Sequence, residues 1–124
     1  MTYIVAILVL CLVIALLVFA KPFKGKAYPD LVVDSLPTML DFYTDTCPAC
    51  QQMAPIVDVL EAQYKGKVSV RRVNASTEPD LAKRFNVMYV PTYVFLDVTG
   101  RVREKQVGGN PSKLADAFAD AAGR

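Results

Sequence analysis

The sequence predicts an α/β fold, in which a four-stranded mixed sheet is covered by helices and follows an apolar N-terminal segment. Short runs of apolar and β-branched residues alternate with segments whose apolar residues recur at helical spacing, as is typical of α/β proteins. The turn from Asp97 to Gly100 separates the last two strands and predicts an antiparallel hairpin. The 124 residues allow one domain of ordinary size.

We expect the order β-α-β-α-β-β-α in this domain. The strands are predicted over residues 38–43, 68–73, 93–96 and 102–107. The helices are predicted over residues 47–64, 77–85 and 110–121. Thr46 and Thr77 are expected to cap the first two helices, and Asn110 precedes a proline that suits the first turn of the third. Pro55 falls inside the first helix and should kink it.

The N-terminal segment is predicted to attach the domain to a membrane. The expected regions are a transmembrane anchor over 1–20, a basic linker over 21–29 and the domain over 30–124. Residues 3–20 carry no charge and would contact the lipid bilayer. A cleaved signal peptide is the alternative, although a positive N-terminal region is missing. Cys11 lies in this run and is expected to be a buried apolar residue without a chemical role.

Composition excludes several classes of function. The chain has 14 basic residues, 12 acidic residues and no histidine. The basic excess lies in Lys21, Lys24 and Lys26, so the domain itself is close to neutral and is not expected to bind nucleic acid. The lack of histidine excludes Ser-His-Asp and Cys-His catalysis and most zinc enzymes.

Cys47-Pro48-Ala49-Cys50 is the candidate reactive motif of the chain. Alone, C-x-x-C indicates a redox dithiol, half of a zinc site or a coincidence, and zinc binding would need a dimer because zinc takes four ligands. The motif is expected where a buried strand ends and a helix begins. There the helix dipole and free backbone N–H groups favour a thiolate at Cys47. Cys50 follows one turn later, as a resolving thiol would.

The residues around this motif resemble the thioredoxin family. The matches are Asp41-Phe42-Tyr43 six residues before Cys47, the C-x-x-C pair, Pro55, Arg72 at a position where many members have lysine, Val90-Pro91-Thr92 and Gly108. They extend from about Leu36 to the C-terminus. Only about ten residues separate the linker from Thr38, so the resemblance implies a minimal, four-stranded thioredoxin fold without the family's extra N-terminal strand and helix.

The resemblance also implies residue roles. Cys47 would be the nucleophile, Cys50 the resolving thiol and Asp41 a buried acid or base for Cys50, with its pKa raised by burial. Arg72 would tune Asp41, or would be an ordinary solvated charge. No metal and no organic cofactor are implied.

Substrate binding is expected beside the cysteines. The resemblance implies that Val90, Pro91, Thr92, Pro48 and Gly108 bind the substrate. A cis Val90–Pro91 bond would leave the backbone of Val90 free to pair with an extended substrate. The chain departs from the family in having Thr46 in place of tryptophan and Pro-Ala between the cysteines. Asp45 should disfavour a thiolate at Cys47 and thereby favour the oxidised pair, which is the behaviour of a reductant.

These expectations together describe a membrane-tethered thiol–disulfide oxidoreductase that reduces protein disulfides and receives electrons from an upstream thiol reductase. The alternatives are a disulfide oxidase or isomerase, and a non-enzymatic membrane-bound assembly module. The flanking lysines favour a cytoplasmic domain. Membrane-tethered members of the family commonly act outside the cytoplasm, which favours an extracytoplasmic, periplasmic domain. We expect the extracytoplasmic location.

Overall fold

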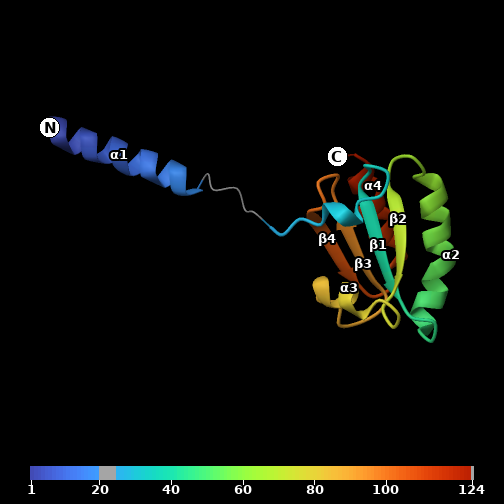
Figure 1. Ribbon diagram of the computed structural model, residues 1–124. Coiled ribbons are helices and arrows are strands. Elements are labelled where there is room, and N and C mark those ends of the chain that lie inside the picture. The colour runs from blue at the N-terminus through green and yellow to red at the C-terminus, as the bar shows by residue number, and fades with distance from the viewer. Residues whose placement is uncertain (20–24, 124) are drawn as a thin grey trace.

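The fold is a single mixed sheet with helices on both faces (Figure 1). The computed structural model describes residues 1–19 and 25–123. Its elements are α1 (Thr2–Phe19), η1 (Pro29–Leu31), β1 (Thr38–Tyr43), α2 (Pro48–Gln63), β2 (Ser69–Asn74), α3 (Pro79–Arg84), β3 (Thr92–Leu96), β4 (Val102–Val107) and α4 (Pro111–Ala122). The expected order from β1 to α4 is therefore confirmed.

The sheet has the strand order β2-β1-β3-β4. β1 pairs with β2 in parallel, and β3 pairs antiparallel with both β1 and β4. This pairing confirms the expected four-stranded mixed sheet and the terminal hairpin. The bounds of β1 and β4 agree with the prediction, and those of β2 and β3 differ from it by one residue.

Two of the predicted helix caps are wrong. α2 is capped by Cys47, whose sulfur accepts a hydrogen bond from the backbone N–H of Cys50, and not by Thr46. α3 begins only at Pro79, because the hydroxyl of Thr77 donates to the carbonyl oxygen of Asn74 and so belongs to the preceding turn. The cap at Asn110 is confirmed: its side chain accepts a hydrogen bond from the N–H of Lys113 at 3.0 Å.

β1 lies at the centre of the sheet and is buried on both faces. Successive side chains of a strand point to opposite faces, so Met39 and Asp41 face α2 and α4, whereas Leu40 and Phe42 face α3. The first face carries a core of Met39, Met53, Val57, Leu60, Val68, Tyr93, Phe95, Leu114, Ala117, Phe118 and Ala121. The second carries Tyr28, Leu31, Leu40, Phe42, Val73, Leu81, Ala82, Phe85, Val94 and Leu96.

The segment before β1 is part of the second core. Tyr28 is buried, and its ring packs on Phe85 with the two centroids 4.5 Å apart. Its backbone N–H donates to the carbonyl oxygen of Gly100 at 2.8 Å, and Ala27 forms a β-bridge with Arg101. The domain therefore begins at about residue 27, earlier than the expected boundary, because an aromatic residue within a lysine- and proline-rich stretch covers the sheet.

The N-terminal helix differs from the expected membrane anchor. Among the described residues, no helix is both long enough and apolar enough to cross a membrane. α1 has 18 residues, which at ~1.5 Å per residue span about 27 Å against a hydrocarbon core of about 30 Å. Cys11 lies on α1 and is exposed, so no protein contact buries it within the described chain, and its expected burial stays a prediction. Residue 20 of the expected anchor and residues 21–24 of the expected linker lie outside the described residues.

Gly100 offers a direct test of the packing between the N-terminal segment and the sheet. It has a φ of +84°, and a Cβ atom there would overlap the backbone of Tyr28 and Pro29. We expect Gly100→Ala to lower the free energy of unfolding by about 3 kcal/mol or more, from the left-handed backbone and the overlap together. Denaturant unfolding of the full chain in detergent measures this effect.

Gly66→Ala is the matched control. Gly66 has a similar φ of +81°, but nothing lies within 4 Å of the added Cβ. Gly66→Ala should therefore lower the free energy of unfolding by only about 1 kcal/mol, which is the cost of the left-handed backbone. Equal losses for the two variants would show that Tyr28 does not hold the hairpin in solution.

Candidate functional site

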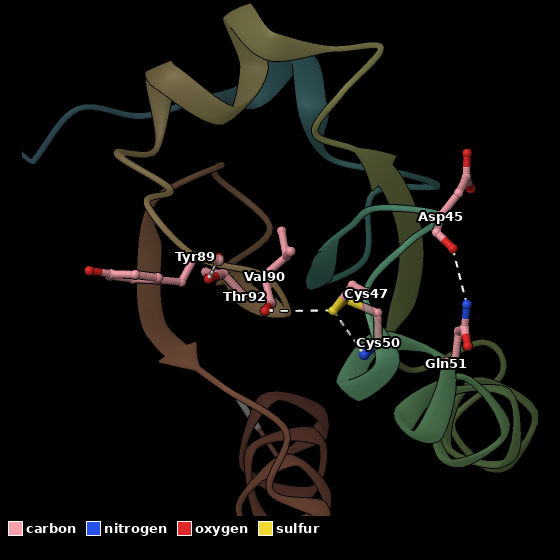
Figure 2. The surroundings of a disulfide bond; sticks show 7 residues. All are labelled: Asp45, Cys47, Cys50, Gln51, Tyr89, Val90 and Thr92. Atoms are coloured by element: carbon pink, nitrogen blue, oxygen red, sulfur yellow. Dashed lines mark hydrogen bonds between the residues drawn. A yellow bond between two sulfur atoms is a disulfide. The ribbon is translucent and has the colours of Figure 1, made fainter.

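The site lies where β1 leads into α2. Cys47 and Cys50 form a disulfide with their Cα atoms 5.2 Å apart. The N–H of Cys50 lies 3.1 Å from the sulfur of Cys47 (Figure 2). The same N–H and the helix dipole would stabilise a thiolate at Cys47 after reduction. The two cysteines are 9% and 8% exposed, so both are buried in the oxidised form.

Asp41 lies on β1 beneath the disulfide and is only 5% exposed. Its burial raises the pKa of the carboxyl from 3.8 to about 6, an effect that the nearby Arg72 guanidinium opposes and the Asp58 carboxylate reinforces. The raised pKa agrees with the direction expected for a buried acid or base. The pKa of Tyr93, the neighbour of Asp41 on β3, is raised by the burial of Tyr93 itself and, to a smaller extent, by the charge of Asp41.

Asp41 and Cys50 line the same cavity, which we call the Asp41 cavity. Its volume is about 310 Å³, and its walls also include Gln51 and Arg72. The cavity has space for water beside both groups, so solvent can link the Cys50 thiol to the Asp41 carboxyl after reduction. Asp41 can therefore exchange protons with Cys50 and with solvent.

The loop before β3 lies against the sulfur of Cys47. The Val90–Pro91 bond is cis, as expected. The sulfur of Cys47 lies 3.7 Å from the carbonyl oxygen of Val90, within reach of a thiol hydrogen bond after reduction (Figure 2). The N–H of Gly108 donates to the carbonyl oxygen of Pro91 at 2.8 Å, which ties the end of β4 to this loop. Gly108 and the Val90 loop are thus brought together, and Pro48 is exposed at the start of α2.

Thr92 differs from its expected role. It is fully buried, and its hydroxyl donates to the carbonyl oxygen of Tyr89 at 2.6 Å. Its side chain therefore fixes the shape of the loop and is not open to contact with a substrate. Pro91 is buried as well, which leaves the Val90 backbone as the accessible part of the expected triplet.

Met88 and Tyr89 are site residues that the sequence reasoning missed. They are 75% and 72% exposed and stand directly before Val90. Figure 2 shows the Tyr89 ring pointing outward, away from the disulfide. Exposed apolar side chains beside a reactive cysteine provide a surface on which a protein substrate can pack. Their position just before Val-Pro-Thr is the signal that could have identified them.

The other side of the disulfide is polar. The backbone carbonyl of Asp45 accepts a hydrogen bond from the Gln51 side chain at 3.0 Å, and its carboxylate accepts one from Asn74 at 3.3 Å. Figure 2 shows the Asp45 carboxylate directed away from the disulfide. The expected effect of Asp45 on Cys47 would therefore act through space and solvent, and it stays a prediction.

Arg72 is neither an unpaired surface charge nor a direct partner of Asp41. It stands opposite Asp41 in the β1–β2 register. Its guanidinium forms ion pairs with two carboxylates of α2, those of Asp58 and Glu61. The neighbouring Arg71 pairs instead with Glu78 at 3.4 Å.

Comparison with known proteins agrees with this geometry. The family model described as Thioredoxin matches residues 20–120. Thioredoxin 1 of Chlorobaculum tepidum is 37% identical over 88 residues, which cover 70% of this chain and 86% of that protein. The chloroplastic M-type thioredoxin of Spinacia oleracea is 31% identical over 97 residues, or 77% of this chain and 53% of that relative, so the chain spans about half of its length.

Solved structures show the same fold. The germline-specific thioredoxin Deadhead of Drosophila melanogaster superposes with a TM-score of 0.68 at 30% identity, over 70% of this chain and 82% of that one. Oxidised mitochondrial thioredoxin 3 of Saccharomyces cerevisiae gives a TM-score of 0.64 at 30% identity, over 68% and 77%. With its C-x-x-C pair joined at the start of α2, the chain belongs to the thioredoxin family of thiol–disulfide oxidoreductases.

Proposed function

We propose that this protein reduces disulfides of other proteins through a Cys47/Cys50 dithiol cycle. One observation carries the proposal: the sulfur of Cys47 caps α2 beside the Val90 carbonyl, while Cys50 adjoins the cavity that holds Asp41. Attack on a substrate disulfide by Cys47 and deprotonation of Cys50 can therefore both take place at the N-terminus of α2.

The cycle starts from the reduced pair. The Cys47 thiolate attacks one sulfur of the substrate disulfide, forms a mixed disulfide and releases the other sulfur as a thiolate. Asp41 accepts the proton of Cys50, and the Cys50 thiolate then attacks the sulfur of Cys47. The mixed disulfide breaks, the second substrate sulfur leaves and takes up a proton, and Cys47–Cys50 is oxidised. The substrate gains the two electrons that the pair loses, and a thiol reductase restores the pair.

The pKa of Asp41 supports its proposed role in the resolving step. A carboxyl with a pKa of about 6 is closer to the pKa of a thiol than an ordinary aspartate is. Proton transfer from Cys50 to Asp41 is therefore less unfavourable than transfer to a solvated carboxylate. Val90 offers its backbone to the substrate on the opposite side of the disulfide, beside Met88 and Tyr89.

We further propose that α1 holds the domain at a lipid bilayer, on the extracytoplasmic side. Support comes from its large apolar side chains, which are exposed around the whole helix, such as Ile4, Leu8 and Leu16. Burial of such a surface in lipid is favourable. An extracytoplasmic domain also gives a tethered reductant substrates that a soluble cytoplasmic one does not reach.

The cysteine roles are tested by substitution in the full chain. Cys47→Ala should abolish reduction of the insulin disulfides in the presence of a dithiol, because the attacking sulfur is gone. Cys50→Ala should accumulate mixed disulfides, visible on a non-reducing gel, because the resolving sulfur is gone. Cys11→Ser is the control and should retain full activity. Activity of Cys47→Ala would assign the nucleophile elsewhere.

The protonation of Asp41 predicts a pH-dependent stability. The carboxyl binds its proton more tightly in the folded protein, so its contribution to stability is full below pH 3.8 and is lost as the pH rises through about 6. Asparagine does not ionise. The stability of oxidised Asp41→Asn relative to the wild type should therefore be greater at pH 8 than at pH 3.5, by about 3 kcal/mol. Denaturant unfolding at the two pH values measures the difference, and parallel curves would contradict a buried, titrating Asp41.

Attachment and side are tested in cells. The full chain should sediment with membranes in alkaline carbonate, and a variant lacking residues 2–19 should remain in the supernatant. In a Cys11→Ser background, a membrane-impermeant thiol reagent should label the reduced pair in intact cells. Labelling only after lysis would place the domain in the cytoplasm, as the flanking lysines suggest.

A further inference from the structure

Arg72 is a cation beside the Asp41 cavity whose charge is directed to α2. Parallel neighbours in register place Arg72 and Asp41 on the same face of the sheet. Both residues line the Asp41 cavity. Yet the hydrogen bonds of the Arg72 guanidinium, within the described chain, go to Asp58 and to Glu61, the latter at 3.4 Å.

The two carboxylates lie on the outer side of Arg72. Asp58 and Glu61 are three residues apart on α2, so their side chains share one face of the helix. The exposed fractions of these side chains are 67% for Asp58 and 48% for Glu61, against 33% for Arg72. The guanidinium is thus drawn from the buried end of the cavity towards solvent.

We propose that Asp58 and Glu61 are positioning residues for the resolving step, which hold the Arg72 guanidinium on α2 and thereby keep it from pairing with the Asp41 carboxylate. The inference rests on the proposed role of Asp41. It assigns a task to two helix residues that touch neither the disulfide nor the substrate.

The chemical consequence follows from the position of the charge. A guanidinium in contact with Asp41 inside the cavity would stabilise the carboxylate strongly, because little water screens the pair there. Such a carboxylate would be a weak base towards the Cys50 thiol. With Arg72 held on α2, its charge acts on Asp41 only at a distance. Burial is then the largest influence on the pKa of Asp41.

The groups that face Asp41 come from several elements. Cys50 and Asp58 belong to α2, Arg72 to β2 and Tyr93 to β3, while Asp45 lies at the edge of the cavity. Of the two positioning carboxylates, Asp58 also acts on Asp41 directly through its charge, whereas no direct effect of Glu61 is resolved. Glu61 is therefore the residue whose removal separates positioning from a direct charge effect.

The experiment is a titration of the Asp41 carboxyl in the full chain, oxidised and in detergent, followed by carbon-13 NMR of labelled aspartate. We expect Glu61→Gln to lower the Asp41 midpoint by about half a pH unit, because Arg72 loses one of its two partners on α2 and turns towards the cavity more often. Arg72→Gln should raise the midpoint. Glu61→Gln in the Arg72→Gln background should then change nothing, because the residue acts only through Arg72.

Glu78→Gln is the matched control, since it removes an equally long ion pair, to Arg71, away from the cavity. The titration midpoint of Asp41 in Glu78→Gln should equal that in the wild type. An unchanged midpoint in Glu61→Gln, or a shift that persists without Arg72, would overturn the inference. Disulfide reduction by the wild type is measured in parallel: its absence would overturn the proposed function, whereas the titration tests the positioning of Arg72 by itself.

The kinetic readout follows the same logic. In Glu61→Gln, the acid limb of the resolving rate should move to lower pH and the rate above it should fall, because Asp41 becomes a weaker base. Attack by Cys47 on the substrate should keep its wild-type rate. A slower attack with an unchanged acid limb would indicate general damage to α2 and would contradict the assignment.

Discussion

The position of Asp41 in the central strand is the constraint on which the site depends. β1 has strands on both sides and a core on both faces, so its side chains have only two directions available. Asp41 shares its direction with Met39 and therefore lies under α2, next to Cys50. A carboxyl held there loses most of its hydration, which is the reason that burial dominates its pKa.

The disulfide separates two environments with different tasks. On one side lie the Val90 carbonyl and Tyr89 (Figure 2). The exposed Met88 precedes them, and in the proposed cycle these residues contact the protein substrate. Behind Cys50 lies the Asp41 cavity, which is open to water. Because the two sides do not share residues, substrate binding and proton exchange would not obstruct each other in the proposed cycle.

The loop beside Cys47 owes its shape to residues that a substrate does not reach. Thr92 is bonded to the carbonyl of Tyr89, and Gly108 is bonded to that of Pro91. Lys105 adds two further contacts, since its ammonium group donates to the carbonyl oxygens of Phe85 and Asn86 at 3.0 and 2.8 Å. β4 thus holds the segment that precedes the Val90 loop, and an edge strand far from the cysteines in sequence contributes to their surroundings.

The sequence by itself determined the strands, the helix order, the redox pair and the presence of a carboxyl under it. The carboxyl was implied by the resemblance to the thioredoxin family. The strands, the helices and the redox pair depend on local periodicity, on turn residues and on motif spacing, which one chain displays directly. Asn110 was predicted as a cap for the same reason. Tertiary structure decided that Cys47 and not Thr46 caps α2, that Thr92 is closed to substrates and that Tyr28 belongs to the core. It also decided that Arg72 turns to Asp58 and Glu61, because a long side chain has several partners within reach and only the packing of α2 on β2 selects among them.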